Sequence, residues 1–356
     1  MWLIHRHRAS FVFLLLLAAP HLASGLPPGL YPLGDLPGSN FHSHGYALSA
    51  DGSVAVGISD SSAGPEAFRW TADGGMVGIG DLPGGSVNSA AFGVSADGNV
   101  IVGVGSTPGE RSFRWTADGG MVEIAPSGGA RAVSADGAVV VGNSNLQAYR
   151  WTEAEGAVGL GDLPGGGFDS LGFDVSADGD VVVGDSQSAS GTEAFRWTAE
   201  TGMVGLGDLP GGPFHSEARG VSADGSVVVG FSDSELDLQA FRWTAEGMVG
   251  LIPPGSFSAA VDVSADGSVI VGNSVQYGVF VWDAVHGVRS VQRMLGYDLS
   301  DWTGMAPQGI SDDGSTIIGF GVRPNGDNEA WIAVLPEPGT LALLALGGVL
   351  PTRRRR

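Results

Sequence analysis

A five-residue motif, Ser-Ala-Asp-Gly-X, recurs along almost the whole chain, and each copy precedes a short run rich in valine and isoleucine. The seven copies begin at Ser49, Ser95, Ser134, Ser176, Ser222, Ser264 and, as the variant Ser-Asp-Asp-Gly, Ser311. Successive copies are 39 to 47 residues apart. Repeats of roughly 40–45 residues that hold several short strands are typical of propeller blades, because one unit buries its apolar faces only against its neighbours.

Each repeat unit predicts four strands. In residues 218–255 an Asp-Gly turn, a strong hairpin signal, joins the first two strands, a polar loop leads to the third, and a glycine leads to the fourth. These predicted strands cover residues 219–222, 226–231, 239–244 and 248–251. The chain is therefore expected to be all-β, a single seven-bladed β-propeller of four-stranded blades.

The two ends of the repeat array complement each other. Residues 31–36 resemble a fourth strand with no first three strands before it, and residues 331–335 resemble a third strand with no fourth after it. If the N-terminal strand completes the last blade, the ring closes without free sheet edges. We therefore expect residues 31–36 to pair with residues 330–335.

The third strand of each unit carries an aromatic residue and a tryptophan on one face, with an arginine between them on the other. Such a row of rings suits either a stacking platform for sugars or bases or the packing of neighbouring blades, and its regularity favours packing. The predicted blade-packing tryptophans are Trp70, Trp115, Trp151, Trp197, Trp243 and Trp282. The arginines are expected to pair with turn aspartates or to stack on neighbouring indoles.

Composition narrows the function classes. The chain has no cysteine, which excludes disulfides and cysteine nucleophiles, and no lysine, so that all basic residues other than histidine are arginines. Residues 26–335 hold eleven arginines and thirty-seven acidic residues, a net charge near −26. A field of this sign repels phosphate backbones, so nucleic acid is excluded as an expected partner.

The two ends carry the signals of an exported protein. Basic residues 5–8, the apolar run 11–19 and the small residues 23–25 predict a signal peptide over residues 1–25, which leaves the propeller in residues 26–335. The tail 336–356 begins with Pro336, Glu337 and Pro338, continues with an apolar segment and ends in four arginines. It resembles the PEP-CTERM sorting signal. That resemblance implies an exosortase partner, a transient inner-membrane anchor, and a cell-surface or extracellular destination.

The repeat units resemble the HAF family of extracellular repeats over about residues 30–335. The shared elements are Ala-Phe-x-Trp, the Gly-Asp-Leu-Pro-Gly-Gly turns and Ser-x-Asp-Gly-x-x-Val-Gly. The histidine that names the family is replaced, by Glu66 in the first unit and Glu193 in the fourth. No reaction is attached to these repeats, so the resemblance implies a fold and an export route but no activity.

No cofactor, catalytic residue or metal ligand is predicted. Oxygen-rich turns suit calcium, but one aspartate per turn is a poor ligand density for that ion. His42 and His44 are expected in a turn between blades, without enough further histidines for a metal site. Helical spacing within residues 290–302, with Ser290 placed to cap and Gly296 to terminate, predicts one or two helical turns.

Two functions of different classes remain open at this point. The favoured one is a monomeric, non-enzymatic binding or structural propeller that meets polysaccharide or an envelope protein through one rim. The alternative is a propeller hydrolase or lyase that acts on exopolysaccharide. Carboxylates from three or more blades converging at the mouth of the central channel would favour the enzyme.

Overall fold

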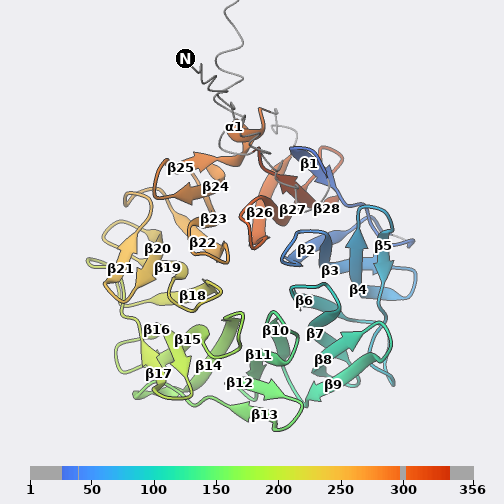
Figure 1. Cartoon of the computed structure of the whole chain (residues 1–356), viewed down its shortest axis with the longest axis horizontal. Helices are drawn as coiled ribbons and strands as arrows, with labels where there is room; N and C mark the ends of the chain where they lie inside the picture. Colours follow the sequence, from blue (N-terminus) through green and yellow to red (C-terminus); the bar gives the residue numbers. More distant parts are fainter. Residues whose placement is uncertain (1–25, 39, 297–301, 337–356) are drawn as a thin grey trace, which may run out of the picture.

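Seven four-stranded antiparallel sheets surround a central axis in the computed structural model, which describes residues 26–38, 40–296 and 302–336 (Figure 1). The predicted seven-bladed β-propeller is confirmed. The second strand of each blade begins with a largely buried run of small and β-branched residues that ends in a buried glycine. No helix within these described residues is both long and apolar enough to cross a membrane.

In the first six blades the strands run from the axis outward in chain order. Blade 1 comprises β2 (Ser43–Leu48), β3 (Val54–Ser61), β4 (Gly64–Thr71) and β5 (Gly75–Gly78). Blade 2 comprises β6 (Ala90–Val94), β7 (Val100–Ser106), β8 (Glu110–Thr116) and β9 (Gly120–Ala125). Blade 3 comprises β10 (Gly129–Val133), β11 (Val139–Ser144), β12 (Gln147–Thr152) and β13 (Gly156–Gly159). Blade 4 comprises β14 (Gly165–Val175), β15 (Val182–Ser188), β16 (Thr192–Thr198) and β17 (Gly202–Gly205). Blade 5 comprises β18 (Ser216–Val221), β19 (Val228–Asp233), β20 (Leu238–Thr244) and β21 (Gly247–Gly250). Blade 6 comprises β22 (Ser258–Val263), β23 (Val269–Ser274), β24 (Gly278–Asp283) and β25 (Gly287–Ser290).

Blade 7 joins the two ends of the chain. It consists of β26 (Thr303–Ile310), β27 (Thr316–Val322), β28 (Asn328–Val334) and, outermost, β1 (Gly29–Pro32). Because β1 pairs with β28, the predicted closure is confirmed. The strand itself lies earlier than the expected 31–36, because the chain turns inward after it and buries Leu33 and Leu36 in the cluster between blades 7 and 1.

The Ser-Ala-Asp-Gly motif forms the turn between the first and second strands of each blade. In blade 5 the Ser222 hydroxyl donates to Asp224 Oδ1 over 2.7 Å, and that same oxygen accepts the Ser226 N–H. Gly225 has a φ of 69°, which the turn requires and a side chain would strain. The turn therefore closes on its own hydrogen bonds in every copy.

A closed circle of seven backbone hydrogen bonds joins these turns. The N–H of the residue after each motif serine donates to the carbonyl oxygen of the equivalent residue in the next blade, over 2.9–3.1 Å. The members, which we call the turn ring, are Ala50, Ala96, Ala135, Ala177, Ala223, Ala265 and Asp312. Asp312 donates back to Ala50, so the circle needs all seven blades.

Side chains also join adjacent blades. Ser216 of blade 5 donates to the Gly207 carbonyl oxygen over 2.6 Å and accepts the Ala194 N–H, both in blade 4. The expected pairing of the third-strand arginines with turn aspartates is wrong: Arg196 Nε donates to the Gly225 carbonyl oxygen over 3.1 Å. The aspartates already accept hydrogen bonds within their own turns, so the arginine donates to the glycine carbonyl oxygen beside them.

The one described helix, α1 (Val291–Leu295), follows blade 6, as the sequence predicts. Ser290 stands at its N-cap without a side-chain hydrogen bond, and Gly296 ends it in the left-handed conformation. Val291 joins the apolar cluster between blades 6 and 7, so the helix covers part of that seam.

The closure predicts the effect of an engineered cross-link. Leu30 lies directly opposite Ala333 in the β1–β28 pair, and paired residues of antiparallel strands bring their Cβ atoms close enough for a disulfide. In the variant Leu30→Cys with Ala333→Cys, oxidation should raise the free energy of unfolding by about 2–4 kcal/mol, because the bond constrains almost the whole unfolded chain. Thermal or denaturant unfolding of the oxidised and reduced protein measures this.

The reduced protein is the control, since the natural chain has no other cysteine. A chain that forms no cross-link under oxidation, or unfolds identically with and without it, would contradict the pairing of the two ends.

Candidate functional site

The inner strands enclose a cavity of about 220 Å³ along the propeller axis. Every blade contributes to its wall, and its lining includes the whole turn ring. The axis is the region around which the seven blades gather in Figure 1. This channel is the candidate functional site, because it is where all seven repeats meet.

Each inner strand bulges at the same position, three residues before the motif serine. Pairing with the second strand shifts there in all seven blades. A bulge re-aims the extra side chain and leaves it out of the ladder. The side chains at this position, which we call the bulge ring, all line the cavity: Tyr46, Phe92, Arg131, Phe173, Arg219, Val261 and Gln308.

Aromatic rings and guanidinium groups pack together in the bulge ring. The guanidinium carbon of Arg131 lies 4.6 Å from the ring centre of Phe92, and that of Arg219 lies 4.2 Å from the ring centre of Phe173. Tyr46 contacts Phe92 at 5.1 Å between ring centres. Burial, and then the like charge of Arg219, lower the pKa of Arg131. The two cations therefore act on each other within one channel.

One residue further along, two blades carry a carboxyl group where the others carry glycine or alanine. Asp174 accepts the N–H groups of Val175 and Val221, both over 2.8 Å, and so bridges blades 4 and 5. Asp262 bridges blades 6 and 7 in the same way, through Ile310. Deep burial raises the pKa of both carboxyl groups, and for Asp262 the charge of Asp174 adds to this.

An aromatic stack joins blades 7 and 1, between side chains of β27 and β2. The ring centres of His44 and Phe320 are 3.8 Å apart, with planes 14° from parallel. Burial lowers the pKa of His44 to about 4, so this imidazole is neutral. The expected turn position of His44 is wrong, because it lies on β2, where strand pairing continues further than the sequence suggests.

The same two positions at the seam of blades 4 and 5 hold acidic residues, Glu217 and Asp185. Glu217 forms an ion pair with Arg219, and its carboxylate lies 3.4 Å from the His215 imidazole. Burial, and then the charge of Glu217, raise the pKa of Asp185 to about 7. This seam therefore brings together Glu217, which is paired with Arg219, and Asp185, whose carboxyl group holds its proton near neutrality.

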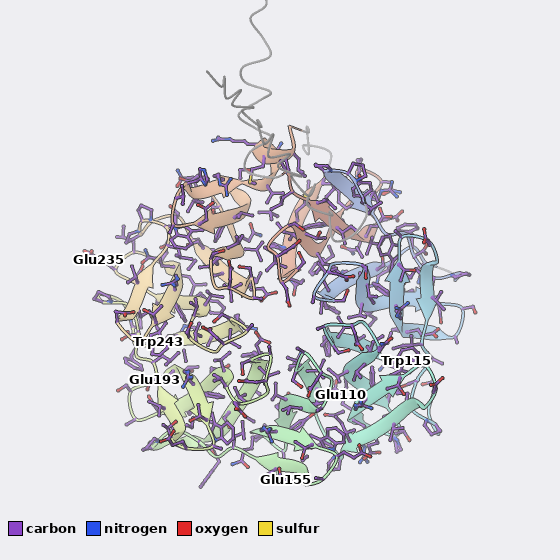
Figure 2. All side chains as sticks on the ribbon, in the orientation of Figure 1. Glu110, Trp115, Glu155, Glu193, Glu235 and Trp243 are labelled. Carbon is purple, nitrogen blue, oxygen red and sulfur yellow. The ribbon has the colours of Figure 1, made fainter. Side chains whose placement is uncertain are left out.

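The residues singled out from the sequence lie away from this channel. The tryptophans are in or beside the apolar clusters between blades; Trp115 and Trp243, labelled in Figure 2, lie nearer the outer rim than the axis. Of the sorting motif, Pro336 follows blade 7, while Glu337 and Pro338 lie outside the described residues. Across residues 26–38, 40–296 and 302–336, no three His, Asp or Glu side chains are grouped to hold a metal ion.

Reasoning from the sequence missed the bulge ring. Its signal was present: aligning the seven units on their serines leaves the position three residues earlier occupied by tyrosine, phenylalanine, arginine, valine and glutamine. The position immediately before the motif serine, in contrast, holds only valine, leucine or isoleucine. The alignment does not reveal the bulge. The bulge directs this side chain toward the channel, although strand alternation alone would place it on a face of the sheet.

The comparisons with known proteins support the fold of this chain and nothing further. No protein-family model and no curated protein matches the chain. Among solved structures, a hydrazine synthase chain from Kuenenia stuttgartiensis aligns over 86% of this chain and 96% of its own, with 12% identity and a TM-score of 0.51. At that identity the likeness shows a shared fold and no more.

Two TolB structures align less well. TolB from Acinetobacter baumannii has 16% identity and a TM-score of 0.42, and the alignment covers 57% of this chain and 51% of that one. A putative TolB from Agrobacterium tumefaciens has 13% identity and a TM-score of 0.43, with 87% and 92% covered. Both TM-scores are below 0.5, so these two alignments carry no argument about this protein.

The buried carboxyl groups predict how stability depends on pH. Because the pKa values of Asp174 and Asp262 are raised on folding, their stabilisation is full below about pH 4 and is lost as the pH rises through the raised values. The turn aspartates act oppositely: the Ser226 N–H and the Ser222 hydroxyl lower the pKa of Asp224 to about 2, and that stabilisation is lost in strong acid. The melting temperature should therefore be higher at about pH 5 than at about pH 8.5.

The double variant Asp174→Asn with Asp262→Asn should show a smaller difference between the two pH values. This comparison is needed because repulsion within an acidic protein changes in the same direction. Asp180→Asn is the matched control, since Asp180 is exposed and Asn99 already stands at the equivalent position of blade 2. An unchanged pH dependence in the double variant would contradict the assignment.

Proposed function

We propose that the protein is an exported, non-enzymatic binding propeller that holds a saccharide unit of a cell-surface or extracellular polysaccharide in the mouth of its central channel. The observation that carries this is where the repeats differ. Third-strand tryptophans and turn serines recur because each seam and each turn needs them, whereas the bulge ring changes from blade to blade. When the packing residues of a repeat are constant and the residues of one concave wall vary, that wall is the expected ligand-binding surface.

The chemistry of the wall suits a saccharide. Ligand sites combine flat apolar surfaces with a few oriented polar groups. Tyr46, Phe92 and Phe173 supply rings, and the arginines and Gln308 supply hydrogen-bond donors. Each channel arginine lies over a phenylalanine ring, a contact that favours one position of its guanidinium group. A preorganised wall of this kind loses little conformational entropy on binding.

The size of the channel limits what it holds. A cavity of about 220 Å³ is smaller than the roughly 300–1,000 Å³ of drug-sized sites. One sugar unit at the end of a chain or at a branch fits this description better than a long polymer segment or a folded partner. The rest of the polymer would then lie outside the mouth.

An enzymatic alternative rests on the acidic groups of the channel. Asp174, Asp262 and Asp312 come from three blades and line the cavity. Carboxyl groups from three or more blades at the channel are the feature expected of the enzymatic alternative. The first two are occupied by backbone N–H groups, which favours a structural role. Asp185 lies outside the cavity lining, but burial and the charge of Glu217 raise its pKa to about 7, a value suited to general acid–base chemistry, and this keeps a polysaccharide hydrolase or lyase as the second candidate.

Binding in the channel predicts a position-specific effect of mutation. Phe173→Ala removes a ring of the channel wall, and it should weaken saccharide binding by about tenfold or more in a glycan-array screen followed by calorimetric titration. Phe168→Ala is the matched control on the same strand, because Phe168 is 88% exposed and outside the cavity.

Loss of binding in Phe168→Ala but not in Phe173→Ala would move the site to the outer rim and overturn the channel assignment. Shortening of the bound saccharide during titration, abolished by Asp185→Asn, would instead establish the enzymatic alternative.

Export predicts the two ends of the mature protein. The propeller residues begin after the basic and apolar leader, and the tail begins at Pro336 with the residues that resemble a sorting signal. Mass spectrometry of the released protein should find an N-terminus close to residue 26 and a C-terminus close to residues 336–338. A secreted product that retains the four terminal arginines would contradict processing by an exosortase.

A further inference from the structure

We propose that the saccharide bound in the channel is acidic, and that Arg131 binds its carboxylate; this rests on the proposed binding function. The starting observation is the unequal pairing of the two channel arginines. Arg219 has Glu217 as its ion-pair partner. Arg131 forms neither an ion pair nor a hydrogen bond through its side chain within the part of the chain that the structure describes.

The orientation of Arg131 leaves its donors free for a ligand. Its guanidinium lies over the face of Phe92, a contact that uses the face of the group and not its N–H edges. The planar fork of N–H groups matches the two oxygens of a carboxylate. Because Phe92 in turn contacts Tyr46, the fork is held within an aromatic wall on the channel.

None of the three carboxyl groups that line the cavity, those of Asp174, Asp262 and Asp312, forms an ion pair with Arg131. Asp174 and Asp262 each accept two backbone N–H groups, and desolvation raises the pKa of both. Burial, and then the charge of Asp313, raise the pKa of Asp312 as well. The charge of Glu110 favours the charged form of Arg131, but the two side chains form no ion pair. A half-buried cation without a carboxylate partner loses part of its hydration, and a bound anion compensates for that loss.

The charge of the whole protein favours a carboxylate over a phosphate or sulfate polymer. Residues 26–335 carry a net charge near −26, which repels a densely charged polyanion before it reaches the channel. A saccharide with one carboxylate among neutral hydroxyls meets less repulsion. Its single charge is sufficient for the one unpaired arginine of the bulge ring.

The experiment compares three probes with one sugar framework: a disaccharide with a terminal uronic acid, the same disaccharide with its carboxyl reduced to an alcohol, and the same disaccharide carrying a sulfate or phosphate ester. Calorimetric titration should give about tenfold or more tighter binding for the uronate than for its neutral form. Arg131→Gln should abolish this preference and retain the neutral binding. Arg131→Lys should keep part of it, since the charge stays and the fork is lost.

Arg293→Gln, on the exposed face of α1, is the matched control and should leave all three affinities unchanged. Melting temperatures of the variants show that each is folded. Equal affinity for the uronate and the neutral form, or tighter binding of the ester, would overturn the proposal while leaving a saccharide-binding propeller in place. If none of the saccharides binds the natural protein, the proposed function and this inference fail together.

Discussion

The closed circle of backbone hydrogen bonds around the axis is the constraint on which the rest of the structure depends. Each bond joins a turn to its counterpart in the next blade, and the last bond returns to the first turn. The last bond joins Asp312 of the final blade to Ala50 of the first, and that final blade takes its outermost strand, β1, from the other end of the chain. Pairing of the two ends therefore completes the blade that closes the circle and covers the outer edge of β28.

The turns can form this circle because they satisfy their own side chains. The motif serine and aspartate bond each other and the following N–H groups, so the backbone beside them stays available for the neighbouring blade. The same local closure explains why the third-strand arginine bonds a glycine carbonyl oxygen and not a carboxylate. A motif that resembles a row of calcium ligands in the sequence is instead a row of self-contained turns.

The channel combines a regular frame with irregular contents. The bulge repeats in every inner strand, but the side chain that it directs inward differs, and at Asp174 and Asp262 a buried carboxyl group replaces a small residue. Each of these carboxyl groups links two blades where the wall would otherwise have only close backbone contact. The expected pH dependence of stability and the polar lining of the cavity therefore both arise from positions where one blade carries a different residue from the other blades.

The sequence alone determined the number of blades, the four strands of each, the closure by the N-terminal strand and the short helix before the last blade, because these depend on repeat length, strand alternation and turn chemistry, which are local properties. The tertiary structure alone decided the channel. Whether Arg131 and Arg219 share a cavity, or Glu217 meets Asp185, depends on a bulge and on the angle between blades, which bring together residues from separate repeats. No spacing along the chain encodes that proximity, since it arises only when seven similar units close into a ring.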